Sequence, residues 1–195
     1  GILHCYAGTG INNYAASAPL ADLRLEKNLV NTGNIKANDT VDYDITVFND
    51  GPMAIDLNQF SAGNRALITD IYPGADLTFV DSDDANISCQ DLGPGSVAYV
   101  GPAGEDHDDH QLMVCAFTGN SQILASGSST TIRLSFTADS AISNSFTNYA
   151  FHNILSTDPD TTTINSALGT ATQDILDTFT NENFAKATYA STDND

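Results

Sequence analysis

A nearly unbroken alternation of apolar and polar residues between Thr40 and Asn49 constrains the fold more than any other feature of the sequence. Four apolar residues share one register: Val41, Tyr43, Ile45 and Val47. We assign the polar residues to the side that faces water: Asp42, Asp44, Thr46 and Asn49. Period-two alternation is typical of a β-strand with one face on a core and the other in solvent. Asp50-Gly51-Pro52 then predicts a turn, because glycine tolerates positive φ and proline donates no hydrogen bond to a sheet.

Strand-like segments recur along the chain at short intervals, separated by turn residues. They are Ala21–Leu29, Ala66–Gly74, Ala75–Val80, Asn86–Gln90, Ser96–Val100, Gln111–Phe117, Ser129–Asp139 and Asn144–Leu155. Many short strands without convincing helical periodicity predict an all-β antiparallel sandwich, which we place at residues 20–171. Residues 1–19 and 172–195 are then N- and C-terminal extensions. In the second of these, periodicity does not decide between a short helix at Ile175–Phe179 and a strand at Phe184–Tyr189.

The charge balance excludes several classes of partner. Six Lys and Arg residues against 25 Asp and Glu residues give a formal net charge of −19. Phosphate-rich partners would be repelled, so binding to nucleic acid or to an anionic membrane is not expected. No apolar run approaches the roughly 20 residues of a membrane-spanning helix. The sequence also lacks the common hydrolase, nucleotide-binding and metalloprotease motifs, so we do not expect an enzyme.

The order of several motifs is similar to a known repeat. "ADLRLEKNL", "NDTVDYDITVFNDGP", "ALITDIYPGADLTFV", "GSSTTIRLSFTA" and "STDPDT" follow one another over roughly residues 20 to 165. This pattern resembles the family called domain of unknown function 11, whose members are immunoglobulin-like sandwiches of bacterial and archaeal cell surfaces. The resemblance implies an immunoglobulin-like fold, an extracellular location and a structural or adhesive role. The acidic insert "GPAGEDHDDHQ", His152 and the segment after "DPDTTT" depart from the family pattern.

Three cysteines bear on the redox environment. The resemblance implies that Cys89 and Cys115 lie on neighbouring strands and form a disulfide, which is typical of extracellular proteins. The alternative is a pair of buried thiols that only pack. Cys5 is the odd one, and an odd cysteine in a secreted chain suggests a bond to another chain or a free thiol.

Three polar residues share the inward register of their predicted strands. Lys27 follows Leu23 and Leu25 at a spacing of two, while Asp70 and Asn148 alternate with apolar neighbours. A buried ammonium group is costly unless it is paired. Surface immunoglobulin-like adhesins sometimes join such a lysine to an asparagine in an isopeptide bond, with a buried acid that shuttles protons. The alternatives are a buried Lys27–Asp70 ion pair capped by Asn148, or a lysine that reaches out to solvent.

Acidic loops provide candidate calcium ligands, because calcium prefers several hard oxygen ligands. The candidates are Asp81, Asp83, Asp84, Glu105, Asp106, Asp108 and Asp109. Solvated charge is the simpler interpretation of these loops, and a transition metal at His107 and His110 is a third one. Glycosylation sequons occur at Asn38 and Asn86.

These features together predict a secreted structural subunit that polymerises into a filament, sheath or surface layer of identical copies. A strand-like leader containing Ile2, Leu3, Cys5 and Tyr6 would add to the sheet edge of a neighbouring copy. The tail "FAKATYA" (Phe184–Ala190) is a second candidate for such pairing. The alternative is a cell-surface adhesin module that binds carbohydrate or protein. Such a module would carry exposed aromatic residues, for which Phe48, Tyr72 and Tyr99 are the candidates.

Overall fold

A computed structural model describes residues 22–58, 67–93, 110–118, 121–152, 182 and 184–191. All regular elements in these ranges are β-strands, and no helix long and apolar enough to cross a membrane occurs among them. The strands are β1 (Leu23–Leu29), β2 (Thr40–Asn49), β3 (Ile55–Asp56), β4 (Leu67–Pro73), β5 (Leu77–Ser82), β6 (Ile87–Asp91), β7 (His110–Phe117), β8 (Ile123–Leu124), β9 (Ser129–Ala138), β10 (Phe146–His152) and β11 (Phe184–Tyr189).

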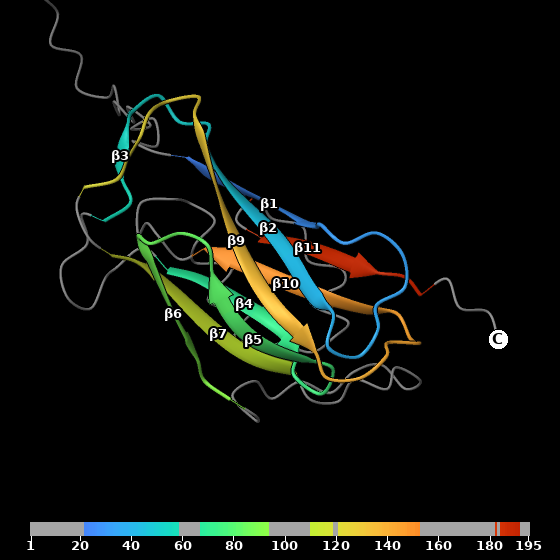
Figure 1. Cartoon of the computed structure of the whole chain (residues 1–195). Helices are drawn as coiled ribbons and strands as arrows, with labels where there is room; N and C mark the ends of the chain where they lie inside the picture. Colours follow the sequence, from blue (N-terminus) through green and yellow to red (C-terminus); the bar gives the residue numbers. More distant parts are fainter. Residues whose placement is uncertain are drawn as a thin grey trace, which may run out of the picture.

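Two antiparallel sheets face each other and form an immunoglobulin-like β-sandwich (Figure 1), which confirms the predicted fold class. The first sheet has the strand order β1-β2-β9-β5, and the second has the order β11-β10-β4-β7-β6. A small third sheet pairs β3 with β8. These two strands contain two residues each, which is too short for any periodicity to predict them. The predicted strand Ser96–Val100 lies outside the described residues.

Buried and partly exposed side chains alternate along β2 as the sequence predicts, but one of our assignments is wrong. Val41, Tyr43, Ile45 and Val47 are fully buried. Asn49 is fully buried as well, so its assignment to the solvent side is wrong. It continues the inward register, and its amide nitrogen donates hydrogen bonds to the carbonyls of Met53 (2.7 Å) and Leu124 (3.1 Å). Burial of the Asn49 amide is tolerated because it is hydrogen-bonded to backbone carbonyls of the loop after β2 and of β8.

Aromatic side chains fill the space between the sheets. Phe136 of β9 lies 4.9 Å from Tyr72 of β4 and 5.8 Å from Tyr43 of β2, measured between ring centroids. The ring of Phe79 on β5 packs against Phe136 from the edge of the first sheet, at 5.6 Å. Such tilted and edge-on pairs add to the stabilisation that comes from burying the rings. Phe136 of the first sheet therefore packs directly against a ring of the second sheet, that of Tyr72.

The C-terminal strand belongs to the sandwich, which corrects the predicted boundary at residue 171. β11 pairs antiparallel with β10 and completes one edge of the second sheet. Phe184, Ala185, Ala187 and Tyr189 are buried there. The backbone nitrogen of Leu25 in β1 also donates a hydrogen bond of 2.7 Å to the carbonyl of Glu182. The segment that we expected to pair with another copy is thus used within its own domain.

Candidate functional site

Three strands bring Lys27, Asp70 and Asn148 together in the interior. Lys27 lies on β1 of the first sheet and points inward with Leu23 and Leu25. Asp70 on β4 and Asn148 on the neighbouring β10 come from the second sheet. Ala150 is the direct partner of Asp70 in that pairing, so Asn148 lies one diagonal step away on the same face. The lysine therefore faces the acid and the amide across the core.

Lys27, Asp70 and Asn148, which we call the buried triad, contact one another directly. The Lys27 ammonium donates a hydrogen bond of 2.8 Å to Oδ1 of Asn148 and forms an ion pair with Oδ2 of Asp70. The residues Asp70 and Asn148 are 0% exposed, and Lys27 is 5% exposed, so the lysine does not reach solvent. The ring of Tyr43 lies under the ammonium, with its centroid 4.9 Å from Nζ.

Desolvation by burial is the largest cause of the pKa shifts of Lys27 and Asp70. Removal from water lowers the pKa of Lys27, and the Asp70 carboxylate opposes this shift. The same desolvation raises the pKa of Asp70, against the effects of Lys27 and Asn148. Both shifts favour the neutral forms, an amine and a carboxylic acid. Burial also raises the pKa of the Tyr43 hydroxyl, which therefore stays protonated.

Three polar atoms around this ion pair are buried without a well-formed hydrogen bond. They are Oδ1 of Asp70, Nδ2 of Asn148 and the hydroxyl of Tyr43. The Asn148 carboxamide is nonetheless near enough to the Asp70 carboxyl and to the Tyr43 hydroxyl to lower the pKa of each of them. Each unsatisfied buried group costs about 1–3 kcal/mol. The noncovalent cluster is therefore incompletely satisfied, although it is fully enclosed in the interior.

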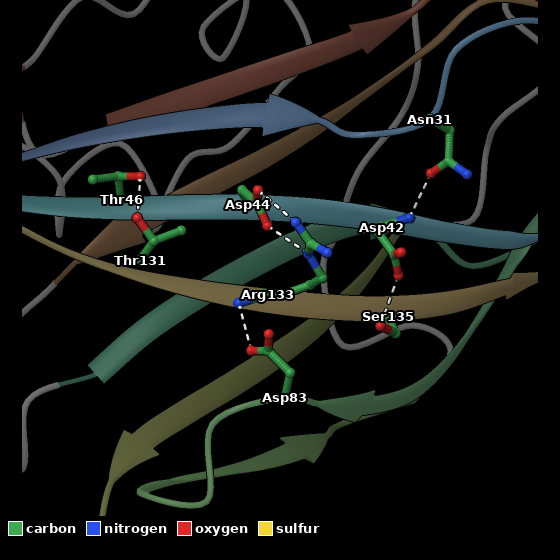
Figure 2. A network of polar contacts seen from close by, with 8 residues as sticks. All are labelled: Asn31, Asp42, Asp44, Thr46, Asp83, Thr131, Arg133 and Ser135. Carbon is green, nitrogen blue, oxygen red and sulfur yellow. Dashed lines mark hydrogen bonds and ion pairs between the residues drawn. The ribbon is translucent and has the colours of Figure 1, made fainter.

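A second polar arrangement covers the outer face of the first sheet (Figure 2). Arg133 on β9 forms a bidentate ion pair with Asp44 on β2, with distances of 2.7 Å from Nε and 2.9 Å from Nη2. The Ser135 hydroxyl donates a hydrogen bond of 2.7 Å to Asp42, two residues further along both strands. The hydroxyls of Thr46 and Thr131 form the third cross-strand contact, at 2.9 Å.

Loop residues extend this outer polar face on two sides. The backbone nitrogen of Asp42 donates to Oδ1 of Asn31 (2.7 Å), and that of Arg133 donates to Oδ1 of Asp83 (3.0 Å). This face was not among the sites that we predicted from the sequence. Its signal was present in the outward registers of Thr40–Asn49 and Ser129–Ala138, which place polar residues opposite one another once the strands pair.

A disulfide joins Cys89 on β6 to Cys115 on β7, which confirms the predicted bond. The two residues are direct partners in the pairing of these strands. The bond therefore fixes the register of β6, which pairs only with β7 among the described strands. Cys5, Ile2, Leu3 and Tyr6 lie outside the described residues.

The acidic residues that we proposed as calcium ligands do not gather in the described part of the chain. There, no three His, Cys, Asp or Glu side chains come together as a metal site. Asp81, Asp83 and Asp84 instead accept hydrogen bonds from the backbone nitrogens of Ser82, Arg133 and Asn86. Glu105, Asp106, His107, Asp108 and Asp109 lie outside the described residues.

The remaining candidate residues are placed as follows. His110 begins β7 and is buried, with Nε2 3.3 Å from the carbonyl of Thr147. Asn38 and Asn86 are both exposed, so their use as glycosylation sites stays a prediction.

The aromatic residues proposed for ligand binding do not form an exposed patch. Tyr72 is 1% exposed and packs in the core, so its proposed role at the surface is wrong. Phe48 is half-buried, and the guanidinium of Arg24 covers its ring at 3.9 Å. Tyr99 lies outside the described residues. A shallow pocket of about 80 Å³ lies between β8, β9 and the residue that follows β3. No titratable group is among its lining residues, which are Leu57, Gln122, Ile123, Leu124 and Thr130.

No protein-family model matches the sequence, and none of the curated proteins is similar to it. The resemblance to domain of unknown function 11 therefore stays a prediction. Solved structures with a similar fold include a biomass-sensing module of an Rsgi2 protein from Clostridium thermocellum, described as resembling a family 3 carbohydrate-binding module. The identity is 15%, the match covers 61% of this chain and 65% of that one, and the TM-score is 0.38. This chain thus spans just under two thirds of that module.

Two further solved structures show the same level of similarity. One is a CBM3a-L domain with flanking linkers from scaffoldin CipA of the Clostridium thermocellum cellulosome, with 17% identity, 62% and 69% coverage and a TM-score of 0.38. The other is the sixth cohesin of scaffoldin B from Acetivibrio cellulolyticus in complex with a Cel5 dockerin, with 10% identity, 67% and 81% coverage and a TM-score of 0.34. At this level, the similarity concerns the fold alone.

Proposed function

We propose that this chain is an extracellular adhesion module without catalytic activity, which binds carbohydrate or protein at a cell surface through the outer polar face of its first sheet. The observation that carries the proposal is the cross-strand network of Asp42, Asp44, Thr46, Thr131, Arg133 and Ser135. The disulfide supports an oxidising, extracellular environment.

The network supports binding because its polar groups are held in place before a ligand arrives. Arg133 and Asp44 are partly exposed, at 38% and 27% of their side-chain surface, so both are accessible to a ligand. Each holds the other through two parallel hydrogen bonds, which reduces the entropy that ligand binding would otherwise cost. The acceptors Asp42 and Asp44 lie on β2, opposite the donors Ser135 and Arg133 on β9, and such a polar face fits hydroxyl-rich or peptide surfaces. The net charge of −19 opposes anionic polymers.

Binding measurements on matched variants test this proposal. Arg133→Ala and the double variant Thr46→Val/Thr131→Val remove parts of the network. The matched control is Thr147→Val/Thr188→Val, because these two threonines form an equivalent 2.9 Å cross-strand contact on the second sheet. Panels of neutral polysaccharides and of cell-surface proteins would serve as ligands. We expect at least a tenfold loss of affinity in the first two variants and none in the control. Equal affinity in all variants, or no ligand in either panel, would overturn the proposal.

A structural subunit of a filament or surface layer is the second candidate function. The observation in its favour is the edge position of β6, which has β7 as its only sheet partner within the described residues and is joined to it by the disulfide. An edge strand accepts an added strand through main-chain hydrogen bonds. Deletion of residues 1–19, followed by electron microscopy, tests the role of the leader. This candidate requires that the shortened protein folds but forms no fibres, and normal fibres would refute the strand-addition mechanism.

A further inference from the structure

The geometry of the buried triad points to a covalent modification site: we propose that Lys27 and Asn148 become joined by an intramolecular isopeptide bond, with Asp70 carrying the proton. The bond would link β1 of the first sheet to β10 of the second through the core. This proposal is independent of the adhesive function and concerns the maturation of the domain itself.

The reacting atoms are already adjacent. Nζ of Lys27 is 2.8 Å from Oδ1 of Asn148, and the carbonyl carbon Cγ is the atom bonded to that oxygen. Nucleophilic attack requires Nζ to move from contact with the oxygen to contact with this carbon. Three strands of two packed sheets hold the partners at this distance, so no loop has to close. Such fixed proximity replaces a bimolecular encounter and accounts for a large part of the barrier reduction in comparable reactions.

The environment supports the protonation states that the reaction needs. An amine attacks only when it is neutral, and burial lowers the pKa of Lys27 in that direction. Burial raises the pKa of Asp70, so this group is able to hold the proton that the lysine gives up. A protonated Asp70 next to the amide also stabilises negative charge on the carbonyl oxygen.

The reaction is balanced without any external reactant. The Lys27 ammonium passes one proton to Asp70, and the neutral Nζ attacks Cγ of Asn148 to give a tetrahedral intermediate. Asp70 then delivers this proton to Nδ2, and the bond between Cγ and Nδ2 breaks with release of ammonia. As the new amide forms, a second proton passes from Nζ to Asp70, which ends neutral. The products are one secondary amide and one ammonia molecule, which takes up a further proton in solvent. No oxidation or reduction occurs.

The product also removes the defects of the noncovalent cluster. Nδ2 of Asn148, which is buried without a well-formed hydrogen bond, departs with the ammonia. The buried positive charge disappears, and a neutral Asp70 is able to donate a hydrogen bond to the new carbonyl oxygen. The side chains of Lys27 and Asp70 are 0% exposed, so water has poor access to reverse the reaction by hydrolysis. Without the reaction, the Lys27–Asp70 ion pair would persist. Oδ1 of Asp70 and Nδ2 of Asn148 would then stay buried without a well-formed hydrogen bond.

Mass spectrometry of the folded protein decides between these states. We expect the denatured, reduced chain to be lighter than its sequence mass by one ammonia molecule. Cyclisation of an asparagine also releases ammonia, so a proteolytic digest must then contain one peptide pair that is covalently joined through Lys27 and Asn148. The full sequence mass, or a lost ammonia without this joined pair, would overturn the proposal.

Variants add a chemical signature that a purely structural role would not give. Asn148→Asp keeps the size of the side chain but must lose water in place of ammonia if the same bond forms. Asn148→Ala and Lys27→Met should give the full sequence mass, whereas Lys36→Met, at an exposed lysine, should retain the ammonia loss. Asp70→Asn should slow the reaction at least tenfold in a time course after refolding. An unchanged rate in a folded Asp70→Asn variant would remove Asp70 from the mechanism.

Discussion

The buried hydroxyl of Tyr72 on β4 donates a hydrogen bond of 2.6 Å to Oδ2 of Asp91 on β6, across the intervening strand β7. Gln111 of β7 lies 2.9 Å from the same hydroxyl. The tyrosine thus connects three strands at the polar end of its ring, while the ring itself packs against Phe136. Burial and the Asp91 carboxylate raise the pKa of Tyr72, so the hydroxyl remains a donor.

Removing this hydroxyl should destabilise the domain, and the chain offers a matched control. We expect Tyr72→Phe to lower the free energy of unfolding by about 1–2 kcal/mol, because it removes the hydrogen bonds of this hydroxyl with the Asp91 carboxylate and Gln111. Tyr43→Phe removes a hydroxyl that is buried without a well-formed hydrogen bond, and should be neutral or stabilising. Urea unfolding of both variants measures the difference. Equal destabilisation would show that the two hydroxyls have equivalent environments.

The disulfide should contribute to stability through the unfolded state. Cys89 and Cys115 are 26 positions apart, and the chain-entropy model gives about 3–4 kcal/mol for a loop of that size. Cys89→Ala/Cys115→Ala should therefore have a lower melting temperature than the oxidised protein. Addition of a reductant should lower the melting temperature of the parent protein but leave the double variant unchanged. A parent protein that is insensitive to complete reduction would contradict this prediction.

Substitutions in β11 should affect the stability of the whole domain. Phe184 is buried against Tyr149 and Phe151 of β10, so Phe184→Ala should cost about 3–5 kcal/mol of unfolding free energy. Lys186→Ala on the same strand is the control, because residue 186 is exposed. Thermal unfolding should shift strongly for the first variant and by little for the second. Small shifts in both would mean that the segment behaves as an extension after all.

One carboxylate provides a prediction about pH. The Ser121 hydroxyl donates a hydrogen bond of 2.6 Å to Asp56, and the backbone nitrogens of Gln122 and Asn58 donate two more, so the pKa of Asp56 is lower in the folded protein. Its stabilising effect is present above the unfolded pKa of about 3.9 and is lost as the pH falls through the folded value. The melting temperature of Asp56→Asn should therefore be lower than that of the parent protein at neutral pH.

This difference should shrink as the pH falls below about 4, and it should vanish below the folded pKa of Asp56, where both proteins carry a neutral side chain at this position. Ser121→Ala removes the main cause of the shift and should reduce the same pH dependence. A gap between Asp56→Asn and the parent that stays constant down to acidic pH would contradict the assignment.

Periodicity predicted the strands well where one face is buried and the other is wet, as in β2 and β9. It also placed Lys27, Asp70 and Asn148 inward, because register alone determines which face a residue occupies. The same period also places Asn49 in the inward register, and its assignment to the solvent side followed the polarity of its side chain instead. Nothing local in the sequence shows which carbonyl groups this buried amide reaches.

Local sequence patterns do not show which distant segments pair. The partner of β11 lies on a strand far away in the sequence, so the segment looked like an extension. Tyr72 looked equally suited to a surface and to a core, because its ring is apolar and its hydroxyl is polar. The outer polar face needed the register of β2 against β9, which the sequence does not specify.

The contact between β1 and the segment leading to β11 has a consequence for how the chain folds. The hydrogen bond from Leu25 to Glu182 joins the first and last parts of the described chain, so it forms only after the residues between them are present. Folds dominated by such distant pairings form slowly, because the entropy of closing a large loop is lost before the contacts are gained. The hairpin that carries the disulfide needs only a short stretch and is able to form early. A growing or partly translocated chain therefore stays open at its β1 edge until the C-terminal strand arrives.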